Sequence, residues 1–207
     1  MDSGRPARVH PDSADAAAHV LTAALMEDPG YVHVLPDARV RHDALRAFYG
    51  FAIRDALRFG RVLAVRDAAG IAGVAVWYPP GRYPMSVRRK LGAVPAMTRL
   101  ALRNPLRLHA LERLGAAIDA AFPAEDASYL EAIGVRPDAQ SHGHGSHLMS
   151  RVIDESERTR VGCYLETARA ENVPYYEALG FARLGEFAPL RRGGPPEARM
   201  IRQPLGR

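Results

Sequence analysis

Apolar positions recur along the chain with two different periods, and these periods predict its elements. Apolar side chains return every three or four residues over 12–27 and 39–58, which predicts two amphipathic helices. Runs rich in valine and isoleucine over 61–66 and 70–78 predict two strands, and Asp67–Gly70 predicts a short hairpin connection between them. The first part of the chain is therefore predicted to be two helices followed by a β-hairpin.

The rest of the chain alternates between helices and strands. In order, the pattern predicts a helical segment over 84–122 that is interrupted at Pro95 and Pro105, a strand over 129–135, a helix over 145–159, a strand over 161–167, a short helix over 174–179 that ends at Gly180, and a final antiparallel pair of strands over 181–187 and 198–203. The strand–helix–strand unit over 129–167 predicts one parallel strand pair in a mixed sheet. We therefore expect an α/β (mixed α+β) fold, with residues 1–207 as a single domain and a helical insertion at about 82–123.

Composition places the chain among ordinary globular proteins. Of its 207 residues, 47% are hydrophobic and 25% are charged, and no apolar run approaches the ~20 residues of a membrane-spanning helix. The first residues lack the apolar core of a signal peptide. Cys163 is the single cysteine, so no internal disulfide is possible and a reducing compartment is favoured. We expect a cytoplasmic protein that does not bind membranes.

The formal net charge of +5 is distributed unevenly along the chain. Residues 82–113 hold eight basic residues against one acid, Glu112. Such a segment attracts nucleic acid or another anion, or forms the solvent-facing sides of helices. Few aromatic residues are interleaved for base stacking, so we favour solvated helix faces and expect no nucleic-acid partner.

A glycine-bearing loop connects the strand over 129–135 to the helix that follows it. The loop contains Gln140-x-x-Gly143-x-Gly145. Glycines let backbone N–H groups approach a ligand closely, and a helix N-terminus stabilises phosphate groups. The segment has neither the Gly-Lys-Ser/Thr of a Walker loop nor the three glycines of a dinucleotide fingerprint. On its own, the pattern is equally consistent with an anion site and with a tight turn that caps a helix.

Two motifs make this loop more specific. The Gln140–Gly145 segment resembles the central motif of the GCN5-related N-acetyltransferase (GNAT) superfamily, in which Gln/Arg-x-x-Gly-x-Gly/Ala follows a strand and cradles the pyrophosphate of acetyl-coenzyme A. The segment Asn172–Phe181 resembles the Asn…Tyr-Glu-x-x-Gly-Phe motif of the same superfamily. The resemblance implies a splayed mixed β-sheet flanked by helices, acetyl-CoA as cosubstrate, and an amine as acceptor.

Finer details of the sequence resemble one group within this superfamily. Ile133–Asp138, Leu165–Thr167 and Asn172–Tyr176 are similar to puromycin N-acetyltransferase-like actinobacterial proteins. This resemblance implies a small-molecule amine acceptor, with antibiotics as one candidate class. Acetylation of a protein N-terminus or lysine, and non-catalytic acyl-CoA binding, are the alternatives that remain open.

The superfamily resemblance also implies roles for individual residues. Tyr176 corresponds to the tyrosine that acts as general acid toward the leaving thiolate. The implied cofactor-binding residues are Ile133, Gly134, Val135, Gln140, Ser141, His142, Gly143, His144, Gly145, Ser146 and Asn172. Ser141 and His142 depart from the motif, which usually has glycine and a basic residue at these positions.

Glu131 is our candidate for the general base that deprotonates the acceptor amine. It precedes Ile133 by two residues on one predicted strand, so we expect both side chains on one face of the sheet. An ion pair between Glu131 and an arginine is the competing structural interpretation. Glu166 on the neighbouring strand and a water molecule are the alternative bases.

Acceptor-binding residues are expected in the helical insertion, at Trp77, and in a predicted loop over Asp28–Leu35 that contains Asp28 and Tyr31. The insertion caps the acceptor pocket, forms a homodimer interface or shields the core. Its apolar residues predict that one side of it is buried; they are Met85, Leu91, Val94, Met97, Leu100, Leu102 and Leu108. The remaining pattern is a group of three histidines, which are His142, His144 and His147. They lack a fourth ligand at a suitable spacing, so no metal is expected.

Overall fold

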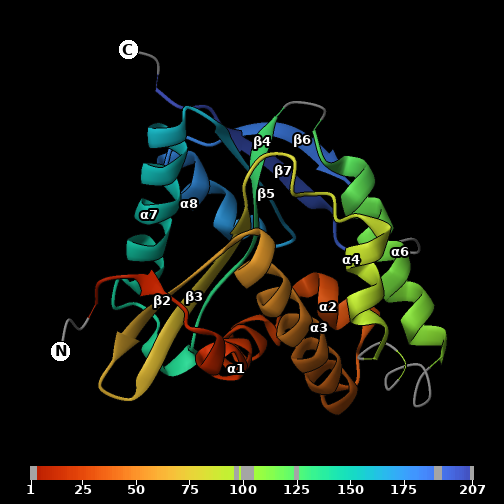
Figure 1. Cartoon of the computed structure of the whole chain (residues 1–207). Helices are drawn as coiled ribbons and strands as arrows, with labels where there is room; N and C mark the ends of the chain where they lie inside the picture. Colours follow the sequence, from red (N-terminus) through yellow and green to blue (C-terminus); the bar gives the residue numbers. More distant parts are fainter. Residues whose placement is uncertain (1–3, 96–97, 99–104, 124–125, 189–192, 206–207) are drawn as a thin grey trace.

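The sheet of the protein contains seven strands in a mixed arrangement (Figure 1). The computed structural model describes residues 4–95, 98, 105–123, 126–188 and 193–205, without the side chains of 105–111. The strands are β1 (Ala7–Arg8), β2 (Arg61–Asp67), β3 (Gly70–Tyr78), β4 (Ala127–Val135), β5 (Gly162–Thr167), β6 (Ala182–Phe187) and β7 (Glu197–Arg202), in the spatial order β1-β2-β3-β4-β5-β7-β6. β4 and β5 are parallel, and the other neighbouring pairs are antiparallel. The predicted mixed fold is confirmed.

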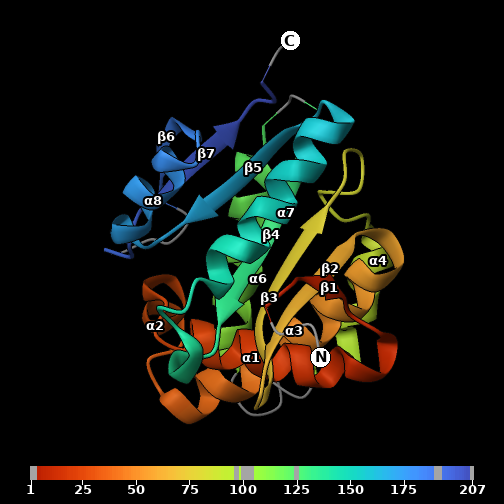
Figure 2. The same cartoon turned by 90° about the vertical axis from the view of Figure 1, so that its left-hand side faces the viewer.

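Helices cover both faces of this sheet (Figure 2). The helices that lie wholly within the described residues are α1 (Ala14–Leu25), α2 (Pro29–Val34), α3 (Ala38–Phe59), α4 (Val87–Lys90), α6 (Pro105–Ala121), α7 (His144–Thr159) and α8 (Val173–Ala178), with short 3-10 turns at Pro11–Ser13, Leu91–Ala93, Pro137–Ala139 and Ala170–Asn172. One buried core lies between α1, α3 and the sheet, and a second lies under α7 and α8. Among the described helices, none is long and apolar enough to span a bilayer.

One segment that the pattern left as a loop is helical. Residues 29–34 form α2, because the Asp28 carboxylate accepts a hydrogen bond from the Gly30 N–H at 3.0 Å and Pro29 occupies the first turn. Arg41 of α3 fixes this corner by donating to the carbonyl oxygens of Met26 at 2.6 Å and Leu35 at 2.7 Å. The corner between α1 and α2 is therefore held rigidly against α3.

The parallel strands β4 and β5 separate soon after they meet. They pair at Ala127–Gly162, Ser128–Cys163 and Tyr129–Tyr164. Beyond this point β4 continues along β3, whereas β5 continues along β7. The facing edges of the two strands are therefore splayed, as the superfamily resemblance implied, and their backbone groups are left open to a ligand.

A β-bulge interrupts β4 at the same position. Ala132 lies opposite Val76 and Leu130 lies opposite Trp77, so Glu131 is the extra residue. The bulge resets the alternation of side chains, and Ile133 packs toward the α7 core. The electrostatic neighbours of Glu131 include Tyr78 and Asp55 on the α3 side. The expectation that Glu131 and Ile133 share one face is therefore wrong.

The insertion is anchored to the core by a buried ion pair. Arg89 of α4 donates to both carboxylate oxygens of Asp55, and the Tyr78 hydroxyl donates to Asp55 Oδ2 at 2.8 Å. The Arg89 guanidinium also stacks 4.7 Å from the centre of the Phe59 ring. These contacts place α4 on α3.

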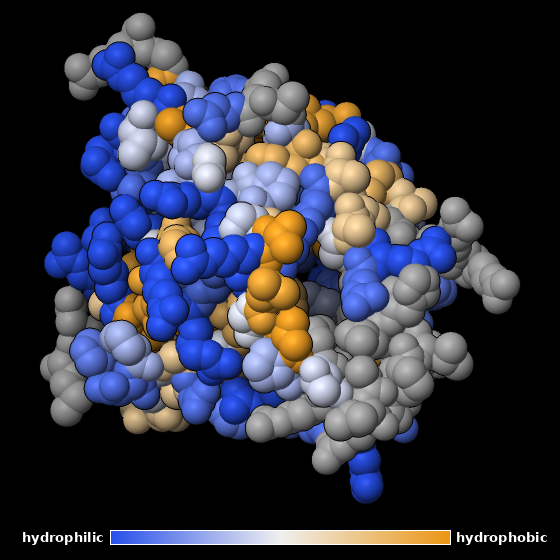
Figure 3. All heavy atoms as spheres, turned by 45° about the vertical axis from the view of Figure 1, so that its right-hand side comes forward, coloured by the Kyte–Doolittle hydropathy of each residue, from blue (hydrophilic) through white to orange (hydrophobic). Residues whose placement is uncertain are grey.

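The apolar residues of the insertion follow the sequence prediction only in part. Met85 packs against the core, whereas Leu91 is 61% exposed and Val94 is 49% exposed, so the prediction is wrong for these two. They reach solvent because the Arg89 anchor presents the opposite side of this short segment to α3. Met97, Leu100, Leu102 and the side chain of Leu108 lie outside the described residues. Hydrophilic residues cover most of the face shown in Figure 3, and apolar residues gather in smaller groups between them.

The close packing of α1 on β4 yields a stability prediction. A methyl group at Gly134 would lie 2.6 Å from Ala24 Cβ and 3.2 Å from Leu21 Cδ2. We expect Gly134→Ala to lower the free energy of unfolding by about 1–3 kcal/mol, as overpacking does. Gly115→Ala in α6 is the matched control, because no atom lies within 4 Å of the added methyl group. Urea denaturation measures the free energy of unfolding of both variants. Equal values for Gly134→Ala and Gly115→Ala would contradict the packing argument.

Candidate active site

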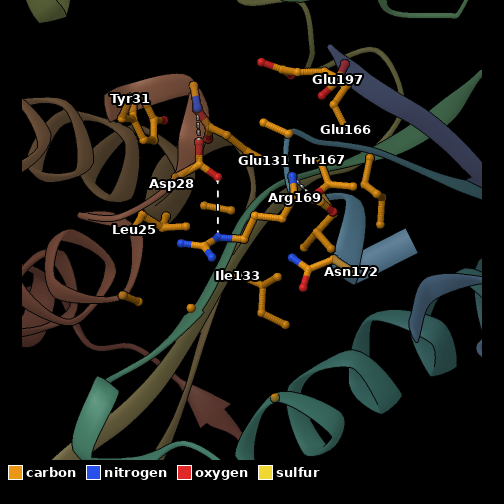
Figure 4. A pocket seen from close by; sticks show the side chains of 18 of the residues that line it. Leu25, Asp28, Tyr31, Glu131, Ile133, Glu166, Thr167, Arg169, Asn172 and Glu197 are labelled. Atoms are coloured by element: carbon orange, nitrogen blue, oxygen red, sulfur yellow. Dashed lines mark hydrogen bonds and ion pairs between the residues drawn. The ribbon is translucent and has the colours of Figure 1, made fainter. Parts of the chain in front are cut away.

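The splay between β4 and β5 opens into a cavity of about 640 Å³. The cavity extends from the start of α7, along both splayed strands, to the α1–α2 corner and β7. Figure 4 shows side chains from these separate elements lying around it. The chain thus brings a glycine-bearing turn and several carboxyl groups into one continuous space.

The turn before α7 forms one end of the cavity. Gly143 caps α7 in a left-handed conformation, with φ 78°, and provides no side-chain cap. The first N–H groups of α7 are therefore left without intrahelical acceptors, as an anion site requires. Gln140 and Gly145 line the cavity. The other residues assigned to this turn, which are Ser141, His142, Gly143, His144 and Ser146, adjoin it in sequence but are not part of the cavity wall.

The rings of two histidines of this turn are stacked on each other. His142 Nδ1 lies 2.7 Å from the Gln140 carbonyl oxygen, and the rings of His142 and His144 are 6.2 Å apart. Among the described residues, no three His, Cys, Asp or Glu side chains are grouped as metal ligands.

The middle of the cavity lies between β4 and α8. Ile133, Gly134 and Val135 line it from β4, and Asn172 lines it from the opposite side (Figure 4). Packing also requires glycine at position 134, because α1 leaves no room for a side chain there. This part of the cavity is where the superfamily resemblance places the pantetheine arm.

Glu131 faces the cavity at the bulge in β4. Its Oε2 atom is buried and has no hydrogen-bond partner. Burial raises the pKa of Glu131 to about 8, and the negative charge of Asp55 adds to the rise, whereas the Tyr78 hydroxyl and Arg89 oppose it. The carboxyl is therefore protonated at neutral pH, and a cation beside it would favour its ionised form.

Tyr176 lines the cavity from α8. Its ring packs against Phe181 with centroids 5.7 Å apart, and the residue is 6% exposed. Burial raises the pKa of its hydroxyl above the ordinary value, so the group keeps its proton. Within the described residues, the hydroxyl has no hydrogen-bond partner and remains available as a donor.

Two of the three residues expected at the acceptor end line the cavity. Asp28 and Tyr31 lie at the α1–α2 corner, and the Tyr31 hydroxyl is 2.9 Å from that of Tyr49. Trp77 does not line this cavity. It is 4% exposed and packs into the core under α7, because its place in the β3 alternation turns it to the other face. The structure therefore places Trp77 away from the acceptor end.

Sequence reasoning missed two residues at this end. Glu197 of β7 lines the cavity and is 8% exposed, and burial raises its pKa to about 7. Arg169 lies 3.9 Å from Asp28 and 3.2 Å from Glu171, and it donates to the Glu27 carbonyl oxygen at 2.6 Å. No sequence signal indicated Glu197, because β7 reaches the cavity by pairing with β5, a placement that local patterns do not contain.

A comparison with protein-family models supports the geometry. Residues 38–181 match the model of the acetyltransferase (GNAT) family, which covers well over half of the chain. The chain belongs to the GNAT family of acetyltransferases. Its fold and enzyme class are those of the family, and the cosubstrate of GNAT enzymes is acetyl-CoA.

Solved structures share the GNAT fold over nearly the whole chain. A Corynebacterium glutamicum protein described as histone acetyltransferase HPA2 and related acetyltransferase has a TM-score of 0.72 at 22% identity, covering 99% of this chain and 98% of that one. A Drosophila melanogaster polyamine N-acetyltransferase has a TM-score of 0.62 at 13% identity, covering 96% and 98%. The Escherichia coli ribosomal-protein-S18-alanine N-acetyltransferase has a TM-score of 0.54 at 17% identity, covering 97% and 94%. At these identities, the likeness concerns the fold alone.

Proposed function

We propose that this GNAT enzyme transfers an acetyl group from acetyl-CoA to a primary amine of a small molecule. The observation that carries the proposal is one continuous cavity that joins the α7 turn to Glu131 and Tyr176. The α6 side chains Leu114 and Ile118 and the α2 residue Tyr31 line its far end, which favours a small acceptor with an apolar portion. We propose a single domain, since β1 and β7 lie outside the family match and belong to the same sheet.

The cavity residues fit acetyl-CoA. The α7 turn offers free backbone N–H groups for the pyrophosphate, and the open edge of β4 at Ile133–Val135 offers backbone groups for the pantetheine arm, with Asn172 opposite. When bound, acetyl-CoA supplies the acetyl group as a thioester. Its carbonyl carbon forms a new bond to the amine nitrogen as the bond to sulfur breaks.

Protein residues then manage two protons. The ionised Glu131 carboxylate takes the proton from the acceptor ammonium, which leaves a nucleophilic neutral amine. The Tyr176 hydroxyl gives its proton to the leaving thiolate, and the second proton, which the nitrogen loses as the amide forms, returns to Tyr176 through solvent. Because both groups lie on the walls of one cavity, positioning of the two substrates contributes a large part of the rate.

Titration calorimetry with acetyl-CoA, followed by a thiol-release assay over a panel of amines, tests the proposed function. Puromycin belongs on the panel because Ile133–Asp138 and Asn172–Tyr176 resemble puromycin N-acetyltransferase-like proteins. Binding together with amine-dependent thiol release is the expected result. Failure to bind acetyl-CoA would overturn the proposal.

The α7 turn yields a prediction about cofactor affinity. Gly143 has φ 78°, a conformation that costs a residue with a side chain about 1–2 kcal/mol. Relief of this strain would turn the N–H groups of α7 away from the cavity, so we expect Gly143→Val to raise the Kd of acetyl-CoA about tenfold. Gly143→Asn is the control, because asparagine tolerates this conformation. Unchanged affinity in the valine variant would remove the turn from the binding site.

A further inference from the structure

The acceptor end of the cavity contains more acidic groups than acetyl transfer requires. One carboxylate suffices to deprotonate an amine, yet Asp28, Glu131, Glu166 and Glu197 all line this space. They come from the α1–α2 corner and from β4, β5 and β7, so the fold gathers them from four separate segments.

The basic residues near these groups leave part of the negative charge without a partner. Arg169 pairs with Asp28, and Arg199 lies opposite Glu166 in the pairing of β5 with β7. The hydroxyls of Tyr164 and Tyr129 favour the ionised form of Glu166, but its Oε1 atom is buried without a hydrogen-bond partner. Glu197 is more than nine-tenths buried, and no described residue forms a hydrogen bond or an ion pair with it. Buried carboxylates without partners are costly, so a bound cation would stabilise them.

The carboxyl groups form two separate positions that favour a positive charge, one at Glu166 and Glu197 and the other at Glu131. Figure 4 shows Glu166 and Glu197 side by side, with Glu131 between them and the Ile133 side of the cavity. Neighbouring carboxylates repel the charge of Glu197. Burial raises the pKa of Glu197 most, and the negative charges of Glu166 and Asp28 raise it further. The side chains of Tyr31, Leu114 and Ile118 also line the space and offer apolar contacts for a carbon chain.

We propose that the acceptor carries a second cationic group, which Glu166 and Glu197 bind while Glu131 faces the amine that is acetylated. The acceptor class is then a diamine, or an amine joined to a guanidinium group by an aliphatic spacer. This inference rests on the proposed function and narrows its substrate.

Matched acceptors test the inference directly. Putrescine and cadaverine are compared with butylamine and pentylamine, which have the same carbon chains and lack the second charge. We expect kcat/KM for the diamines to exceed that for the monoamines by about 10- to 100-fold, the range that a charged hydrogen-bonded contact provides. Equal values for diamines and monoamines would overturn the inference and leave the proposed function standing.

Variants of Glu197 and Glu166 locate the second charge. Glu197→Gln and Glu166→Gln keep the shape of each side chain, so we expect the ratio of kcat/KM for putrescine to kcat/KM for butylamine to fall about tenfold or more in each variant. Glu177→Gln is the matched control, since Glu177 is exposed on α8 and lies outside the cavity wall. A diamine advantage that survives in both variants would overturn the assignment to these residues.

A binding measurement tests this inference without requiring acetyl transfer. Tetramethylputrescine, a tertiary diamine that cannot form an amide, should raise the thermal midpoint of the wild-type protein more than dimethylbutylamine does. We expect Glu197→Gln to abolish this difference. If no amine released thiol, the proposed function would fail, while this shift would still decide whether the cavity binds a dication. An equal shift with both compounds would overturn the inference.

Discussion

Replacing Glu131 by glutamine is expected to lower kcat/KM for amine acetylation by about 10²- to 10⁴-fold, the usual contribution of a general base. Glutamine keeps the shape of the side chain at the bulge and cannot accept the proton of the ammonium group. The affinity for acetyl-CoA should not change, because we assign the binding of that molecule to the α7 turn and the edge of β4. Thiol-release kinetics and calorimetry measure the two quantities separately.

The pH dependence identifies this residue further. Burial and Asp55 and Asp119 raise the pKa of Glu131 to about 8, while the Tyr78 hydroxyl and Arg89 lower it. The carboxyl must lose its proton to act as a base, so kcat/KM of the free enzyme should rise with pH until about 8. This rise should vanish in Glu131→Gln. A variant that retains the same profile would exclude Glu131 as the base.

The stability of Glu131→Gln shows whether a loss of activity comes from the missing base or from misfolding. A carboxyl whose pKa is raised on folding contributes stability that is fully present below its unfolded pKa, near 4.5, and is lost as the pH rises through about 8. Glu131→Gln removes this loss, so the variant should be at least as stable as the wild type at pH values above about 8. Low activity in a stable variant then reflects the missing base.

Removal of the Tyr176 hydroxyl is expected to have the second large effect on catalysis. Tyr176→Phe should lower kcat by about 10²- to 10³-fold, because the thiolate then leaves without a general acid. The phenylalanine ring keeps the edge-to-face contact with Phe181, so the affinity for acetyl-CoA and the fold should change little. Single-turnover kinetics measure the chemical step directly.

The neighbouring tyrosine is the matched control for this change. Tyr175 is 39% exposed and lies next to Tyr176 on α8, with ring centroids 5.4 Å apart. Tyr175 also lines the cavity, so Tyr175→Phe removes a hydroxyl from the same helix and the same wall. It should leave kcat within about twofold of the wild type, the small effect expected at a half-exposed position without a role in proton transfer. Equal rates for Tyr176→Phe and the wild type would exclude Tyr176 from proton transfer.

Local periodicity predicted most of the elements that build the site. The hairpin, the parallel unit over 129–167 and the antiparallel pair near the end of the sheet all follow from the alternation and spacing of apolar residues. The α2 helix was missed because its six residues are too few to show a helical period, and its formation depends on the cap at Asp28.

The features that the sequence did not reveal depend on pairing between strands that are distant in the sequence. The position of β7 between β5 and β6 brings Glu197 to the cavity, and this order depends on contacts distant in sequence. The bulge at Glu131 likewise depends on the register with β3, so counting residues along β4 assigned Ile133 to the wrong face. Trp77 follows the ordinary alternation of β3, which turns it away from the cavity.

The bulge in β4 also has a meaning for the evolution of this enzyme. Because residue 131 is extra to the strand pairing, no residue of β3 lies opposite it. Exchange of this side chain therefore leaves the pairing of β3 with β4 unchanged. Selection is free to alter the chemistry offered to the acceptor at this position while the scaffold stays constant.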